Sequence, residues 1–179
     1  MLLAMKDAMS NYFKVRREYF EKGLDFLFKT SYNENVQSII YQGEMDEDEE
    51  ILWNPVQKNN HSDIKPLEER FHIKFHSSID CYFNSYWFAE LDGFMDGHYI
   101  TLEAVLPNIE LDTFERNLKG YKRNHDKLDK VPIGIEGNGL VVVIHNISGK
   151  IELEDFERGC FKEIANSLED LISSLRLQR

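Results

Sequence analysis

The C-terminal half of the chain carries three short apolar runs separated by tight turns, and this spacing restricts the fold more than any other feature. The runs are Ile133 to Glu136, Leu140 to His145 and Lys150 to Leu153. Glycine and asparagine fill the gaps at 137–139 and 146–149, as is typical of hairpin turns. Connections this short join only antiparallel strands, because parallel neighbours need a crossover of a dozen or more residues. We therefore expect an antiparallel sheet, with Gly149 at positive φ in its second turn.

The rest of the chain supplies helices and further strands. Apolar residues from Met5 to Leu27 recur at helical spacing, which predicts an amphipathic helix that ends or bends near Gly23. Further helices are expected from a cap at 62–63 through Phe71, around 79–83, from a capping box at Asp112, and over 161–175. Further strands are expected at 36–41, 51–53, 87–91 and 99–105, with Gly93 and Gly97 in the turn between the last two.

These strands come in runs and do not alternate with helices, which favours the α+β class. At 179 residues the chain is long enough for one hydrophobic core. The sequence therefore predicts a single domain over 1–179, with a mainly antiparallel central sheet flanked by N-terminal, middle and C-terminal helices.

The apolar segments and the cysteines indicate a cytoplasmic protein. The longest apolar run, Leu140 to Ile144, is far shorter than the ~20 residues that span a bilayer. Lys6 and Asp7 interrupt the apolar N-terminus, so no signal peptide is expected. Cys81 and Cys160 lack CxxC spacing and are expected to be reduced and buried.

Negative charge is concentrated in the middle of the chain. Residues 41–115 hold 4 Lys and Arg against 17 Asp and Glu, a net charge of -13, whereas the whole chain carries -11. Within this region, six of the seven residues from Glu44 to Glu50 are acidic. Such a field repels nucleic acid and anionic lipid headgroups and attracts a basic partner. We therefore expect a basic protein surface as partner, with no nucleic acid and no direct lipid binding, unless the charge serves solubility alone.

No pattern in the sequence demands catalysis. His72 and His76 lack a third and fourth ligand at usable spacing, so no metal is expected. The glycines from Gly134 to Gly139 lie between two expected strands and predict a hairpin, not a nucleotide loop, and no cofactor is expected. Glu90 and Asp92 would share one face of a strand, as a carboxylate-based hydrolase requires, but acids are frequent throughout this region. A binding protein is the favoured class.

The chain resembles the Syd family of bacterial proteins in the order and spacing of six segments. They are 51–55 (ILWNP), 67–71 (LEERF), 79–91 (IDCYFNSYWFAEL), 112–120 (DTFERNLKG), 146–151 (NISGKI) and 166–171 (NSLEDL). The similarity extends over 44–175 and is poorest over 1–40. Two departures stand out: Tyr121 occupies a position where the family usually has histidine, and Leu106-Pro107 replaces a tryptophan-containing segment.

The resemblance implies an α+β fold of the superfamily known as SUKH, which also includes fungal cell-wall regulators and bacterial immunity proteins. It also implies a non-enzymatic cytosolic protein that binds basic cytoplasmic loops of the SecY channel subunit in an acidic concave groove and checks the assembly of the channel. Such a protein would be peripheral on the cytoplasmic face of the membrane. Cytosolic loops of membrane proteins carry an excess of Lys and Arg, which agrees with the acidic charge found above.

Acids and aromatic residues of the middle region are the predicted partner-binding residues. They are Trp53, Glu68, Asp80, Tyr82, Tyr86, Glu90, Asp92 and Glu103. The aromatic rings would provide cation–π contacts to Lys and Arg, unless they pack in the core. One alternative is an immunity protein that blocks a basic toxin, such as a nuclease, with the same acidic face. A weaker alternative is the carboxylate-based hydrolase. A toxin gene directly upstream would favour the immunity protein.

Overall fold

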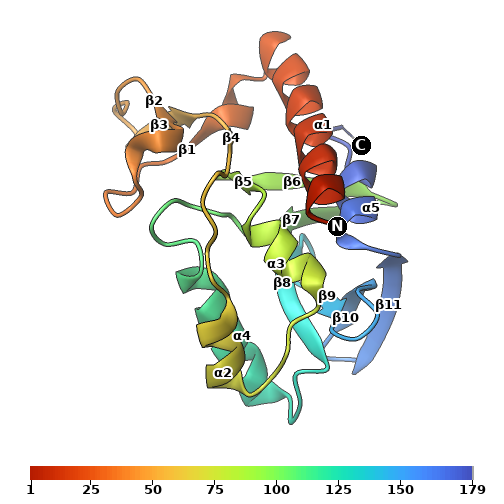
Figure 1. Ribbon diagram of the computed structural model, residues 1–179. Helices are drawn as coiled ribbons and strands as arrows, with labels where there is room; N and C mark the ends of the chain where they lie inside the picture. Colours follow the sequence, from red (N-terminus) through yellow and green to blue (C-terminus); the bar gives the residue numbers. More distant parts are fainter. Residues whose placement is uncertain (179) are drawn as a thin grey trace.

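The structure is a computed structural model that describes residues 1–178 (Figure 1). Its main element is a six-stranded sheet in the order β11-β10-β9-β8-β7-β6, in which every neighbouring pair is antiparallel. The strands are β6 (Leu91–Met95), β7 (His98–Leu102), β8 (Lys130–Glu136), β9 (Val141–His145), β10 (Ile151–Asp155) and β11 (Cys160–Ala165). The prediction of an α+β domain built on an antiparallel sheet is confirmed.

Short turns join β8, β9 and β10, as the sequence predicted. Glu136 accepts the amide of Gly139 through its main-chain oxygen at 2.8 Å, which closes the β8–β9 hairpin. The next turn is closed at 2.8 Å by the amide of Gly149 and the carbonyl of His145. Gly149 has φ +75° there, the positive value that was expected.

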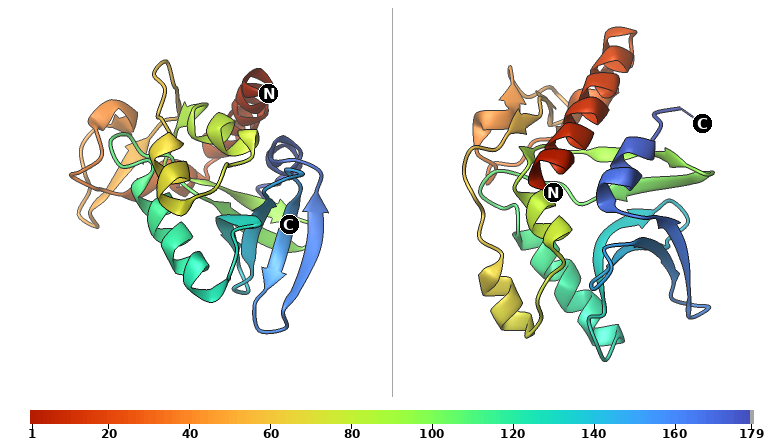
Figure 2. Two further views of the ribbon diagram at one scale, coloured as in Figure 1. Left: turned by 60° about the horizontal axis from the view of Figure 1, so that its bottom comes forward. Right: turned by 45° about the vertical axis from the view of Figure 1, so that its right-hand side comes forward.

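Within residues 1–178, five α-helices pack beside the sheet (Figure 2). They are α1 (Leu2–Glu21), α2 (Lys65–Phe71), α3 (Ser77–Phe83), α4 (Asp112–Asn124) and α5 (Leu168–Ser174). α1 packs against α5 and α3, and α4 lies against β8. α1 buries Met5, Met9 and Phe13 along one face, as the helical spacing of its apolar residues predicted. Within residues 1–178, no helix has the length and hydropathy needed to cross a membrane.

A small lobe holds the acidic segment. Strands β1 (Lys29–Ser31), β3 (Glu50–Trp53) and β2 (Tyr41–Gln42) pair in that order, preceded by 3-10 helices η1 (Asp25–Phe28) and η2 (Ser38–Ile40). The expected strand over 36–41 is therefore mostly the η2 turn. Asp46, in the β2–β3 loop, accepts the amides of Asp48 and Glu50 and pairs with Lys29 at 2.7 Å. A two-stranded pair, β4 (Val56–Gln57) with β5 (Tyr86–Trp87), lies between this lobe and the rest of the chain.

Three expectations about the elements were wrong. The segment expected to begin the last helix is the edge strand β11, because it pairs with β10, and α5 begins only at Leu168. Cys160 lies on that strand and is exposed, whereas Cys81 is buried as expected. The capping box at Asp112 is absent, since Glu115 forms ion pairs with Arg70 and Lys119 instead.

The hairpin of the aromatic region is shifted toward the C-terminus relative to the expectation. Its turn lies at Asp96 and Gly97, both at positive φ, and Gly93 is inside β6. A Cβ at Gly93 would lie 2.8 Å from the carbonyl oxygen of Arg176, whose backbone pairs with Phe94. The close approach of the C-terminal segment therefore explains this glycine better than a turn does.

Candidate docking groove

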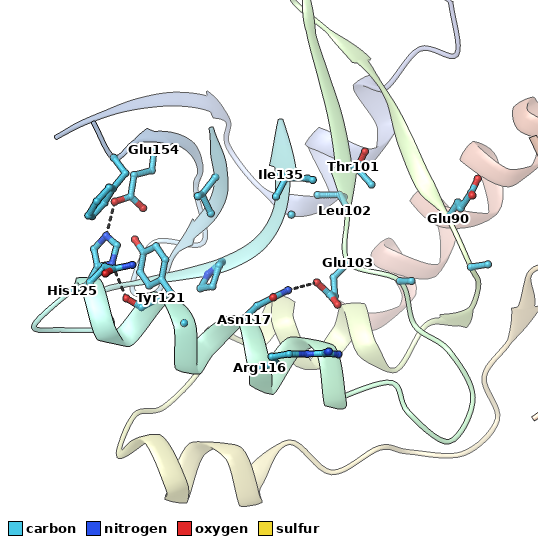
Figure 3. Close-up of a pocket in the computed structure, with 18 residues that line it drawn as sticks. Glu90, Thr101, Leu102, Glu103, Arg116, Asn117, Tyr121, His125, Ile135 and Glu154 are labelled. Atoms are coloured by element: carbon cyan, nitrogen blue, oxygen red, sulfur yellow. Dashed lines mark hydrogen bonds and ion pairs between the residues drawn. The ribbon is translucent and has the colours of Figure 1, made fainter. Parts of the chain in front are cut away.

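An open groove of about 660 Å³ lies between α4 and the sheet (Figure 3). Its floor is apolar and crosses three strands, with Leu102 from β7, Ile135 from β8 and Val141 from β9. Arg116, Asn117, Gly120 and Tyr121 of α4 form one wall. A groove with this floor can hold aliphatic portions of a ligand while polar groups at its walls fix the orientation.

Three carboxylates are spaced along the groove. Glu90 precedes β6, Glu103 follows β7, and Glu154 belongs to β10, so they follow the order of the strands across the sheet. Figure 3 shows the three side chains in this order along the groove. The acidic segment 44–50 does not line it.

Glu90, at one end, is held by a buried arginine. Arg16 of α1 is 1% exposed, and its Nη2 donates to Glu90 Oε2 at 2.8 Å. The same guanidinium donates through Nε to the carbonyl of Leu27 at 2.8 Å and through Nη1 to Asp92. Burial raises the pKa of Glu90 to about 7, although the positive charge of Arg16 opposes this effect. Glu90 thus faces the groove with only part of its charge available to a ligand.

Glu103, in the middle, has no cationic partner. Asn117 Nδ2 donates to its Oε2 at 2.9 Å, and no Lys, Arg or His within residues 1–178 forms an ion pair with it. Burial raises the pKa of Glu103 to about 7, against the Asn117 hydrogen bond and the charge of Arg116. The hydroxyl of Tyr82 donates to the main-chain oxygen of Glu103 and fixes its backbone.

Glu154, at the other end, is buried against His125. His125 Nδ1 lies 2.8 Å from the carbonyl oxygen of Tyr121 and must donate to it, so Nδ1 carries a proton. The other ring nitrogen, Nε2, contacts Glu154 Oε1. The His125 ring also stacks on Tyr121, with ring centroids 3.7 Å apart. Glu154 is only 3% exposed, so little of its carboxylate is accessible from the groove.

Of the eight predicted partner-binding residues, Glu90 and Glu103 line the groove. Trp53 and Tyr82 are 0% exposed, so the interpretation of these rings as contact surfaces fails in this structure. Trp53 packs on Phe28 with ring centroids 5.0 Å apart. Both rings are core residues because large apolar side chains gain most from complete burial.

Two of the predicted acids serve the fold. Glu68 is 9% exposed, accepts the amide of Phe75 at 3.0 Å and pairs with Lys74 at 2.7 Å. Asp92 is bound by Arg16 and by the hydroxyl of Tyr99. Their charges are already neutralised or hydrogen-bonded inside the molecule, so they add little to the field at the groove.

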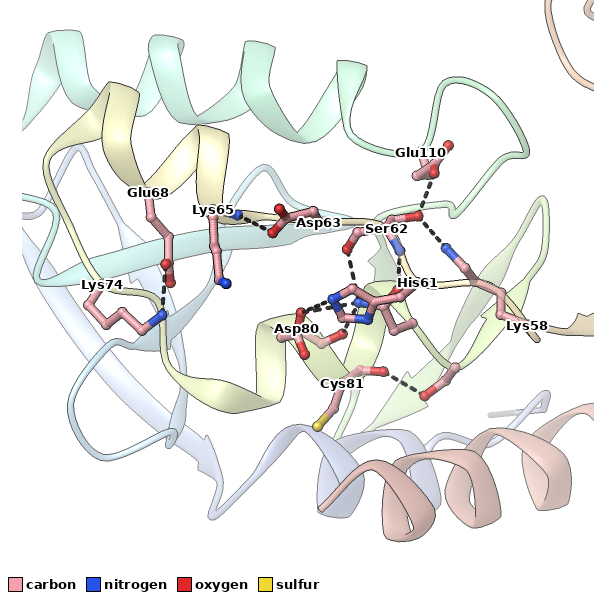
Figure 4. Close-up of polar contacts among 12 residues, drawn as sticks. Lys58, His61, Ser62, Asp63, Lys65, Glu68, Lys74, Asp80, Cys81 and Glu110 are labelled. Atoms are coloured by element: carbon pink, nitrogen blue, oxygen red, sulfur yellow. Dashed lines mark hydrogen bonds and ion pairs between the residues drawn. The ribbon is translucent and has the colours of Figure 1, made fainter.

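The remaining two predicted residues lie outside the groove lining. Asp80 of α3 is half-exposed, 3.6 Å from His61 Nε2, and accepts from Asn84 (Figure 4). Tyr86 is half-buried and packs on Phe13, with ring centroids 5.7 Å apart. Their part in binding stays a prediction.

A cation–π contact of the kind predicted for a partner exists within the chain. Lys58 is 2% exposed, and its Nζ lies 3.6 Å from the centroid of the Trp87 ring. Nζ also donates to Ser62 Oγ at 2.6 Å, and Ser62 in turn donates to Glu110 (Figure 4). Burial lowers the pKa of Lys58 to about 8. The face of Trp87 is therefore occupied by the protein's own lysine.

The α4 wall was missed by reasoning from charge and aromatic content. Arg116, Asn117, Gly120 and Tyr121 recur three and four residues apart, so they share one side of the helix. The apolar stripe of this helix, which includes Phe114 and Leu118, is buried. A polar stripe lies next to it, within the 112–120 segment that carries the family resemblance. This stripe is the sequence pattern from which the α4 wall could have been predicted.

Comparison with known proteins places the chain in a family. The family model "Syd protein (SUKH-2)" matches residues 4–176. Curated relatives named "Protein Syd" include that of Idiomarina loihiensis, 30% identical over 130 residues, which covers 70% of each chain. Another, from Psychromonas ingrahamii, is 23% identical, and the match covers 72% of each chain. A third, from Shewanella frigidimarina, is 25% identical, and the match covers 77% of this chain and 67% of the relative. The match includes most of the first forty residues, where the resemblance was poorest. This protein belongs to the Syd family.

Proposed function

We propose that this protein binds a basic protein segment in the groove between α4 and the sheet, and that the segment is a cytoplasmic loop of the SecY channel subunit. The observation that carries the proposal is the pair of partly exposed carboxylates, Glu90 and Glu103, at the edge of an apolar floor. Lys and Arg side chains combine a long aliphatic stem with a charged end, so they match both the floor and the carboxylates.

Charge supports the same direction. The net charge of -11 draws a Lys- and Arg-rich segment toward the protein and disfavours nucleic acid and anionic lipid. Membership of the Syd family supports SecY as the partner, and regulation of channel assembly would follow from binding there.

The test is equilibrium binding of the purified protein to detergent-solubilised SecY channel. Ile135→Lys is the informative variant, because Ile135 lies on the groove floor and is 62% exposed, so a lysine there brings positive charge without disturbing the core. We expect binding to weaken by more than about 10-fold, since like charges facing each other across an interface cost several kcal/mol. Ile147→Lys, at a turn residue that is 85% exposed and outside the groove, is the matched control.

Unchanged affinity of Ile135→Lys would reject the groove. Absence of SecY binding in the unaltered protein, together with tight binding to a basic toxin that Ile135→Lys weakens, would assign the groove to an immunity function instead.

A further inference from the structure

α4 contains a glycine that the fold itself does not need. Gly120 lies inside the helix, four residues before its last residue Asn124, and its backbone is not at positive φ. A Cβ built at Gly120 would meet no atom within 4 Å. Glycine inside a helix is less favourable than alanine by ~0.8–1 kcal/mol. Neither backbone conformation nor close packing within residues 1–178 explains this glycine.

The space beside Gly120 belongs to the groove. Asn117 precedes it by one helical turn and Asn124 follows by one, and all three line the groove. Any side chain at position 120 would project from the α4 wall into this space. The missing side chain therefore widens the groove in the middle of the wall.

Asn117, one helical turn before this opening, binds the carboxylate of Glu103 through a hydrogen bond of 2.9 Å. Glu103 differs from the other two groove carboxylates. Glu90 pairs with Arg16 and Glu154 with His125, whereas Glu103 has no ion-pair partner among the described residues. Ala104, which follows Glu103 in the chain and is partly exposed, supplies apolar surface beside it.

We propose that Gly120 and Glu103 form a subsite for one lysine or arginine side chain of the bound segment. The charged end is held by Glu103, the aliphatic stem lies on Ala104, and the segment passes the α4 wall where Gly120 leaves room. This inference rests on the proposed function and names the groove's specificity-determining pair.

The electrostatic state of Glu103 suits this role. Its carboxylate has no ion-pair partner among the described residues, and burial raises its pKa to about 7 although the charge of Arg116 opposes this effect. A cation of the partner that enters the subsite supplies the missing charge and favours the ionised form. Glu90 gains less because Arg16 is already its ion-pair partner, and Glu154 is only 3% exposed.

The experiment is a double-mutant cycle between the protein and a peptide. The probes are synthetic peptides of the SecY cytoplasmic loops, and in the loop that binds, each Lys or Arg is replaced in turn by glutamine. We expect Glu103→Gln to weaken binding of the unaltered peptide by about 10-fold, as for a lost hydrogen bond to a charged group. When the peptide lacks the Lys or Arg that occupies the subsite, Glu103→Gln should change affinity less than about 2-fold, because the contact between that side chain and Glu103 is already lost.

Gly120→Gln provides the second arm. It replaces glycine by a good helix former in open space, so the midpoint of thermal unfolding should hold or rise. Binding should nonetheless weaken by more than about 10-fold, because the side chain fills the subsite. Arg123→Gln, on the same helix but outside the groove lining, should leave affinity within about 2-fold.

Four outcomes distinguish failure of the subsite from failure of the proposed function. If Gly120→Gln folds normally and binds as tightly as the unaltered protein, the subsite is rejected. Equal effects of Glu103→Gln on every peptide would also reject it, since no single side chain would then face Glu103. If these variants bind normally and Ile135→Lys binds weakly, the partner uses the groove without this subsite. If Ile135→Lys also binds normally, the proposed function fails as well.

Discussion

Arg16 Nη2 lies 2.8 Å from Glu90 Oε2, and this contact joins the N-terminal helix to one end of the groove. The guanidinium is 1% exposed and also contacts Asp92, the carbonyl of Leu27 and the hydroxyl of Tyr12. Its bonds to Glu90 and Asp92 connect α1 to a segment more than 70 residues away in the sequence. The geometry of Glu90 at the groove therefore depends on the packing of α1 against the sheet.

Arg16→Met should destabilise the protein strongly. It leaves the Asp92 carboxylate and the carbonyl of Leu27 without their buried donor, and breaking a buried ion pair from one side costs ~3–5 kcal/mol. Denaturant unfolding measures the change. Lys14→Met, at an exposed position of the same helix, should alter the free energy of unfolding by less than ~0.5 kcal/mol. If the Arg16→Met variant is as stable as the unaltered protein, the contacts of Arg16 have no structural role.

The two acids that Arg16 binds should respond differently to neutralisation. Asp92 is 16% exposed in its side chain and is also bound by Tyr99, so Asp92→Asn should lower stability by ~1–3 kcal/mol. Glu90 is 39% exposed in its side chain, and water can replace its contact, so Glu90→Gln should be nearly neutral. Unfolding free energies of the two variants provide the comparison. Equal losses would contradict the distinction between a structural acid and an acid that faces the groove.

Gly149 should be less tolerant of substitution than another glycine at positive φ. A Cβ there would lie 2.4 Å from His76 Cε1, whereas Gly159, at φ +62°, has nothing within 4 Å. Alanine is strained at positive φ in both variants, and only Gly149→Ala must also displace the imidazole of His76. We therefore expect the free energy of unfolding to fall by ~1–3 kcal/mol for Gly149→Ala and by about 1 kcal/mol for Gly159→Ala. His76→Ala combined with Gly149→Ala should recover part of the difference. Affinity for SecY should be unaffected in the folded variants, because this turn is outside the groove.

Local signals in the sequence were sufficient for the β8–β10 meander and for α1. The turns at 137–139 and 146–149 specify their hairpins through residues a few positions apart. β11 could not be predicted in this way. Phe161, Ile164 and Leu168 continue the helical spacing of α5, and only the pairing of 160–165 with β10 makes the first part a strand.

The candidate site was only partly predictable for the same reason. Glu90 and Glu103 were among the predicted acids, but nothing local indicates that Arg16, 74 residues away, holds Glu90, or that Glu68 is tied to Phe75. Counting charges locates an acidic region and does not say which acids remain free. That depends on long-range pairing, which the folded structure alone determines.

The stability of the protein should fall between pH 5 and 7 because of Glu103. Burial raises the folded-state pKa of this carboxyl from 4.5 to about 7, so the folded protein keeps a proton in this range that the unfolded chain has lost. The free energy of unfolding therefore decreases as pH rises through this window. Glu103→Gln should make the decrease shallower and raise stability at pH 8 relative to the unaltered protein. Unfolding curves at pH 5, 6, 7 and 8 test this, with exposed Glu69→Gln as control.

The most direct test of groove binding is the association rate of the protein with detergent-solubilised SecY channel across a salt series. Exposed charges are screened over ~8 Å at physiological ionic strength, so electrostatic docking must slow steeply as salt rises. We predict that Glu103→Gln combined with Glu90→Gln lowers the rate and flattens its salt dependence, whereas neutralising Glu47 and Glu49 in the β2–β3 loop has a smaller effect per residue. Rates that are indifferent to salt and to Glu103→Gln with Glu90→Gln would contradict docking in this groove.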